Sequence, residues 1–166
     1  MAAARSARWL WLTVASLAAD RATKLAFERL TAEGYRRELI PGFATFVHSR
    51  NTGMAFGIFG TTQVRWIPYS LPVISGIVVA LLAWLLYSGM VETALAGAGL
   101  ALLAGGAAGN LLDRILHGGV TDFLELHAGS FYWPAFNLAD SAITIGATLL
   151  MIELLRGDSR RAAAQE

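Results

Sequence analysis

Six polar side chains lie within or at the rim of long apolar stretches of this 166-residue sequence. Such groups are costly to hold at membrane depth unless they are paired, so they mark a candidate functional site. At helical spacing, Asn110 lies one turn from Arg114, and Asn137 lies one turn from Asp140. All six fall at the same predicted face of the membrane: Asp20, Asn110, Asp113, Arg114, Asn137 and Asp140.

Carboxylates are the members of this set that suit catalysis. Two carboxylates that lie close together cannot both ionise at low cost, so they share one proton. The ionised member can then take a proton from water, while the protonated member polarises a carbonyl group. Such a pair hydrolyses an amide without a metal ion or a covalent intermediate.

Each acidic residue also has a purely structural interpretation. Asp20 could pair with Lys24, and Asp113 with Arg114, while a carboxylate near a helix N-terminus, such as Asp140, is favoured in any case. Another aspartate, in the apolar segment VTDFL at 120–124, has no neighbouring base and would ordinarily be a solvated loop residue. One residue taken alone fits these interpretations better, but the convergence of several favours a site.

Other catalytic classes find little support. The sequence contains no cysteine, which excludes a thiol nucleophile and thiolate metal sites. His48, His117 and His127 are scattered without metal-ligand spacing, so each is expected at a surface or interface. Ser141 has only Asp140 beside it and lacks a Gly-x-Ser-x-Gly turn. We therefore predict no metal site and no cofactor.

Membrane helices are the elements that must position these groups. The chain is 55% hydrophobic and 15% charged, with a mean hydropathy of +0.52, which is more apolar surface than a soluble core of this size can hide. A net charge of +1 leaves no broad basic face for nucleic acid. We predict a single polytopic domain, all-α in its membrane part, with spans at about 9–27, 66–88, 93–112 and 136–155.

Two of these spans have distinctive sequences. The span at 93–112 is dense in alanine and glycine, and Gly105 and Gly109 have the small-xxx-small spacing of closely packed membrane helices. The first span imitates a cleavable signal peptide, because basic residues precede an apolar run and the small-residue cluster ASLAA. However, Asp20, Thr23 and Lys24 share one helical face and the apolar pattern then resumes, so a retained helix fits better.

Two outer loops, at about 28–65 and 113–135, connect the spans on one side. Apolar and polar residues alternate at 42–49 and at 119–126, which predicts two short strands that could pair as a small extracytoplasmic β element. Four spans place both termini on the same side, and the positive-inside rule puts these tails in the cytoplasm, although arginines also occur in the outer loops. The tail arginines are Arg5, Arg8, Arg156, Arg160 and Arg161.

Five segments along the chain form a specific set of motifs. They are the D-x-x-T-K of 20–24, RNTGMAFGIF at 50–59, GNLLDR at 109–114, VTDF at 120–123 and FNLADS at 136–141. Together these segments resemble one family, signal peptidase II, the bacterial lipoprotein signal peptidases, which are aspartic endopeptidases of the inner membrane. Met54 stands where a serine or alanine is expected, a change without expected effect on the chemistry.

The resemblance assigns roles to residues at matching motif positions. It implies that Asp122 of VTDF and Asp140 of FNLADS form the catalytic pair. It further implies that Asn51, Asn110 and Arg114 hold the substrate. The same resemblance suggests supporting roles for three more residues, Asp20, Asp113 and Asn137.

The resemblance also implies the substrate and the location. The family cleaves prolipoproteins just before a cysteine that already carries a diacylglyceryl thioether, so the expected partners are that substrate and membrane lipids. The expected active site lies near the outer face of the inner membrane, and a monomer is the default. The alternatives are a proton-coupled transporter, because intramembrane acids also build proton relays, and a structural subunit.

Overall fold

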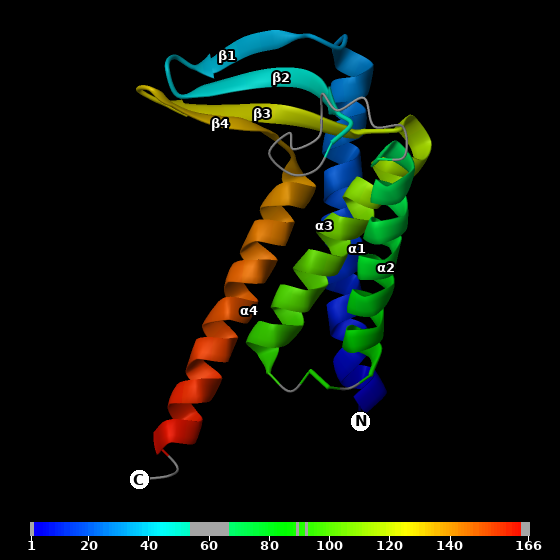
Figure 1. The fold of residues 1–166 in the computed structure, drawn as a ribbon, viewed down its shortest axis with the longest axis vertical. Helices are drawn as coiled ribbons and strands as arrows, with labels where there is room; N and C mark the ends of the chain where they lie inside the picture. Colours follow the sequence, from blue (N-terminus) through cyan, green and yellow to red (C-terminus); the bar gives the residue numbers. More distant parts are fainter. Residues whose placement is uncertain (1, 54–66, 89, 92, 164–166) are drawn as a thin grey trace.

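A bundle of four helices with a four-stranded sheet across one end makes up the fold (Figure 1). The computed structural model describes residues 2–53, 67–88, 90–91 and 93–163. Both chain ends lie at the end of the bundle opposite the sheet. The predicted fold class, membrane helices with a small β element, is confirmed. The helices are α1 (Ala2–Leu30), α2 (Ile67–Tyr87), α3 (Ala94–His117) and α4 (Leu138–Ala163).

Three of the described helices are long and apolar enough to cross a membrane, with candidate spans at Ser70–Tyr87, Ala94–His117 and Leu138–Arg156. Helix α1 is long enough, but charged residues that include Asp20 and Lys24 lower its hydropathy. A fourth span at 9–27 therefore stays a prediction.

Helix α3 lies at the centre and contacts each of the other three helices. A Cβ atom on Gly105 would lie 2.7 Å from the backbone oxygen of Thr13 in α1, and one on Gly106 would collide with the backbone oxygen of Ala139 in α4. These backbones can approach so closely only because the glycines carry no side chain. The close packing predicted for Gly105 is confirmed.

Two strands of the sheet, β3 and β4, connect α3 to α4 along the chain. Its order is β1 (Arg36–Ile40), β2 (Ala44–Asn51), β3 (Val120–Ala128) and β4 (Phe131–Phe136), and all neighbours are antiparallel. The two predicted strands correspond to β2 and β3, which pair as expected. The edge strands β1 and β4 were not predicted from the sequence.

The connections into and out of the sheet are short. Helix α3 continues to His117, five residues beyond the predicted span, and ends at Gly118, whose left-handed φ of 71° turns the chain into β3. Strand β4 then leads directly through Asn137 into α4. The predicted outer loop at 113–135 is thus mostly a hairpin, which brings β3 close to the start of α4.

Candidate active site

Asp140 lies in the first turn of α4, where reciprocal hydrogen bonds fix its carboxylate. The backbone N–H of Asp140 donates to Asn137 Oδ1 at 2.9 Å, and the backbone N–H of Asn137 donates to Asp140 Oδ2 at 3.3 Å. This is a capping box, and the helix dipole favours a negative charge at this position. Asn110 Nδ2 donates to the other oxygen, Oδ1, at 2.8 Å. Both oxygens of Asp140 therefore have a donor.

Asp122 is a buried residue of β3, with 2% of its surface exposed, and its interpretation as a solvated loop aspartate is wrong. Asn137 Nδ2 donates to Asp122 Oδ1 at 2.7 Å, and Asn51 Nδ2 donates to Oδ2 at 3.3 Å. Asn137 thus contacts both carboxylates. A single side chain joins the strand that carries one acid to the helix that carries the other.

The two carboxylates also interact electrostatically. Burial, together with the negative charge of Asp140, raises the pKa of Asp122 to about 7, against the opposing effects of the hydrogen bonds from Asn137 and Asn51 and of the charge of Lys24. Both protonation states of Asp122 are consequently accessible near neutral pH. A group that can hold or release a proton in this range is suited to acid–base catalysis.

A cavity of about 620 Å³ opens beside Asp140, between helices α2, α3 and α4 and the sheet. Its lining is mostly apolar, with a few polar groups among the lining residues. This combination of apolar walls and a few convergent polar groups is typical of a ligand site. The polar lining includes Asn51, Asn110, Arg114 and Asp140, and the apolar lining includes Ile74, Val78, Trp133 and Phe136.

Arg114 links the cavity wall to the segment after β2. Its guanidinium donates to the backbone oxygens of Asn110 and Gly53, both at 3.4 Å. The suggested pair of Asp113 with Arg114 is wrong, because Asp113 points toward α1 and pairs with other cations there. The substitution at Met54 lies outside the described residues.

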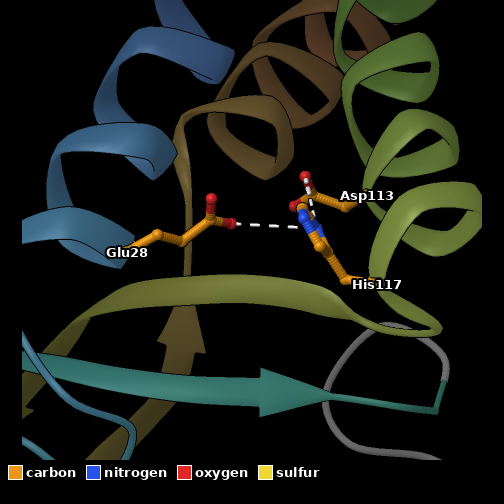
Figure 2. Close-up of side chains that lie close together, drawn as sticks. All are labelled: Glu28, Asp113 and His117. Atoms are coloured by element: carbon orange, nitrogen blue, oxygen red, sulfur yellow. Dashed lines mark ion pairs between the residues drawn. The ribbon is translucent and has the colours of Figure 1, made fainter.

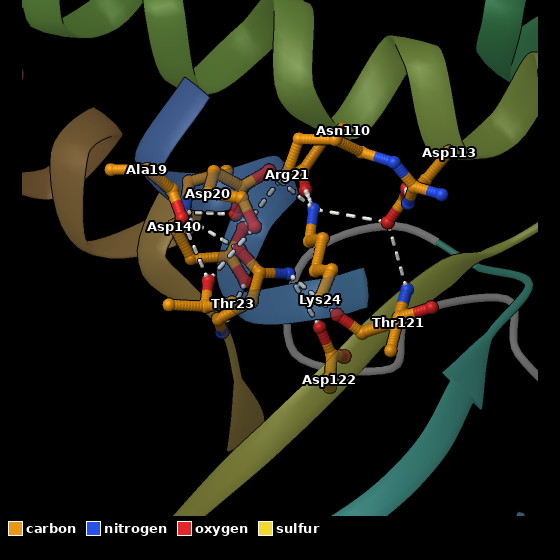
Figure 3. A network of polar contacts seen from close by, with 12 residues as sticks. Ala19, Asp20, Arg21, Thr23, Lys24, Asn110, Asp113, Thr121, Asp122 and Asp140 are labelled. Atoms are coloured by element: carbon orange, nitrogen blue, oxygen red, sulfur yellow. Dashed lines mark hydrogen bonds and ion pairs between the residues drawn. The ribbon is translucent and has the colours of Figure 1, made fainter. Parts of the chain in front are cut away.

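A buried ion group lies behind the cavity, at the contact of α1 with α3 (Figure 3). The ammonium of Lys24 lies 2.9 Å from Asp20 Oδ2 and 3.0 Å from Asp113 Oδ2, and Arg21 pairs with Asp113 Oδ1 at 3.0 Å. The suggested pair of Asp20 with Lys24 is confirmed. Lys24 was not singled out as a site residue, although its side chain is fully buried. The i, i+4 spacing of Lys24 from Asp20 is the sequence feature that could have identified Lys24 as a site residue.

A second group, Glu28, Asp113 and His117, has the residue types of a cation site (Figure 2). His117 Nδ1 lies 3.9 Å from a carboxylate oxygen of each acid. However, the guanidinium of Arg21 already pairs with Glu28 at 3.2 Å and with Asp113 at 3.0 Å. These contacts describe an ion-pair network, in which Thr121 Oγ1 also donates to Glu28 at 2.9 Å.

The structure thus brings all eight predicted site residues to one region at the sheet end of the bundle. Three histidines were expected at a surface or interface. His48 is buried between the end of α1 and β2, where its ring contacts Thr31, so the expected surface position is wrong for this residue. His127 lies on the sheet near Glu125. Neither contacts the aspartate pair.

Comparison with known proteins identifies the family. Residues 12–156 match the family described as signal peptidase (SPase) II, Peptidase_A8. The chain is 42% identical to a lipoprotein signal peptidase of Solibacter usitatus, over 90% of this chain and 92% of that protein, and 42% identical to one of Ectopseudomonas mendocina, over 95% and 94%. A bacterial membrane enzyme solved by the in meso method at 2.3 Å matches with a TM-score of 0.82 and 29% identity, over 93% of this chain and 91% of that one. The chain therefore belongs to the signal peptidase II family.

Proposed function

We propose that Asp122 and Asp140 are the catalytic pair with which this aspartic peptidase removes signal peptides from diacylglyceryl-modified prolipoproteins. Membership of a family of lipoprotein signal peptidases supports the activity. The observation that carries the assignment is Asn137, which donates to Asp122 and caps Asp140.

The reaction follows from the protonation of the pair. Asp122, whose pKa is raised to about 7, holds the shared proton and polarises the carbonyl that precedes the lipidated cysteine. The ionised Asp140 takes a proton from a water molecule, whose oxygen bonds to the carbonyl carbon. The tetrahedral intermediate collapses when the carbon–nitrogen bond breaks and the amine leaves with the proton from Asp140.

Substrate binding is assigned to the cavity. Asn51, Asn110 and Arg114 line it and would hold the peptide, while the apolar walls on α2 and α4 would accept the acyl chains. Asp20, Asp113 and Asn137 would support the catalytic groups rather than touch the substrate. A monomer contains all of these residues.

The membrane arrangement is part of the proposal. We place α1 across the inner membrane as the fourth span, both termini in the cytoplasm and the sheet at the outer face, where a lipid-bearing cysteine would hold the scissile bond. Family membership argues against the transporter interpretation, and so does the position of the acids at one end of the helices. A transporter would hold them near the middle of the bilayer.

The test uses the purified protein in detergent with a diacylglyceryl-modified prolipoprotein, and follows the shift in gel mobility. We expect Asp122→Asn and Asp140→Asn each to slow cleavage by about 10²- to 10⁴-fold. Glu38→Gln, which removes an exposed carboxylate from β1, is the matched control and should cleave at the native rate. Chelator should leave the native rate unchanged. Rapid cleavage by either aspartate variant would disprove the assignment.

A further inference from the structure

We propose that Lys24 is a positioning residue that orients both members of the Asp122–Asp140 pair, an inference that rests on the proposed function of that pair. Its ammonium is fully buried and lies 2.9 to 3.0 Å from one oxygen each of Asp20, Asp113 and Asn110 (Figure 3). Lys24 itself does not contact either catalytic carboxylate, although its charge lowers the pKa of Asp122 through space. Its orienting effect passes through these three partners.

Two of the partners hold the backbone next to the catalytic residues in the same way. Asp20 Oδ1 accepts the backbone N–H of Ala139, which precedes Asp140, at 2.8 Å. Asp113 Oδ2 accepts the backbone N–H of Thr121, which precedes Asp122, at 3.1 Å. Because both aspartates share one ammonium, Lys24 ties the start of α4 and the start of β3 to the same point on α1.

The third partner, Asn110, connects Lys24 to the chemistry. A lysine ammonium can only donate hydrogen bonds, so Asn110 must turn its amide oxygen toward Lys24, at 2.9 Å. The amide nitrogen then faces Asp140 Oδ1, to which it donates at 2.8 Å. A donor favours the ionised carboxylate, whereas an amide oxygen in that place would repel it. Lys24 thereby determines which end of the amide Asp140 meets.

Arg21 provides a matched comparison on the same helix. It also pairs with Asp113, through Oδ1, but its other partner is Glu28 rather than Asn110. Loss of Arg21 should therefore loosen the ion group without turning the Asn110 amide. Two other charged residues lie near the pair, Asp113 and Arg114, and none of the variants below changes either of them.

The experiment measures kcat and KM against pH with the diacylglyceryl-modified prolipoprotein. The main variant is the double Lys24→Met and Asp20→Asn, which removes one positive and one negative charge and keeps an oxygen for the N–H of Ala139. We expect kcat to fall by about tenfold or more, KM to stay within about twofold, and the acidic limb of the profile to move about one pH unit upward. Two variants should leave the acidic limb at its native pH. Lys24→Arg still offers only hydrogen-bond donors to Asn110, and Arg21→Met removes a residue that does not contact Asn110.

Several results would overturn the inference. One is a folded double variant in which the acidic limb of the pH profile does not move. Another is an acidic limb that moves as far in Arg21→Met as in the double variant. If the double variant does not fold, Lys24→Leu with Asp20→Asn replaces it, because a leucine side chain also lacks a donor for Asn110. Failure of both to fold, while Lys24→Arg folds, would make Lys24 a purely structural residue. Cleavage by Asp140→Asn at the native rate would instead refute the proposed function, without involving Lys24.

Discussion

The two parts of helix α3 are held in different ways. Toward the sheet, Asn110 and Asp113 make directional hydrogen bonds and ion pairs to α1, β3 and α4. Farther from the sheet, glycines such as Gly99 and Gly105 let the backbones of α4 and α1 pack directly against α3. Glycine contacts determine how close two helices lie, whereas hydrogen bonds also determine where individual polar atoms point. Activity and stability should therefore respond to changes in different parts of the same helix.

Among changes that leave both aspartates intact, the largest effect should come from Asn137→Ala, at the start of α4, where Asn110 of α3 contacts Asp140. This change removes a donor from Asp122 and the cap of Asp140 together, and we expect kcat to fall by about 10²-fold or more. The loss of the cap should cost only about 1 kcal/mol of stability. Cleavage assays and thermal unfolding would separate the two effects.

Thr148→Val is the control for this prediction. Thr148 is exposed on α4 and bonds only within its own helix among the contacts described, to the backbone oxygen of Thr144 at 2.8 Å. The Thr148→Val variant should cleave the prolipoprotein at the native rate. A folded Asn137→Ala variant with native kcat would show that the polar contacts do not position the pair.

Gly105→Ala should lower stability more than activity, the reverse of Asn137→Ala. Its Cβ would lie 2.7 Å from the backbone oxygen of Thr13, so the α1–α3 contact must open, at a cost of about 1–3 kcal/mol. Gly76→Ala on α2 is the control, because no described atom lies within 4 Å of its Cβ position. Thermal unfolding should show a lower Tm only for Gly105→Ala. A loss of kcat in its folded fraction as large as that of Asn137→Ala would erase the distinction between the two parts of α3.

A smaller effect is predicted for the stability of Asp122→Asn as pH changes. The pKa of Asp122 is raised in the folded protein, from 3.8 to about 7, so its contribution to stability is greatest at low pH and is lost as pH rises through 7. An asparagine does not titrate. The Tm of the variant relative to the native protein should therefore be higher at pH 8 than at pH 5. Tryptophan fluorescence can follow unfolding, and equal differences at both pH values would contradict the raised pKa.

The sequence predicted the parts of this fold that depend on local pattern. Alternation in β2 and β3 and the spacing of Gly105 and Gly109 led to correct expectations. Strand β1 was missed because all of its side chains are exposed, and β4 because it contains Pro134 within an aromatic run without clear alternation.

The site was harder to predict than the fold. The pair of Asp20 with Lys24 follows from i, i+4 spacing, but the contact of Lys24 with Asn110 joins residues 86 positions apart. No local pattern contains that contact. Asp122 alone looked like a solvated loop residue, because the contacts that bury it come from β2 and from Asn137 at the start of α4. Only the family resemblance pointed to its role.

The smallest effect is expected in the sheet, where a network crosses the strands far from the polar end of α3. Arg36 and Tyr132 both donate to Glu125, and the Arg36 side chain is 57% exposed. Solvent screens such a pair, and Glu125 would keep the Tyr132 hydroxyl at 2.7 Å, so Arg36→Met should cost less than about 1 kcal/mol and leave kcat unchanged. Thermal unfolding and the cleavage assay check this. A fall in kcat would mean that the shape of the sheet, as well as the contacts of α3, controls the position of Asp122, because β3 carries both Glu125 and Asp122.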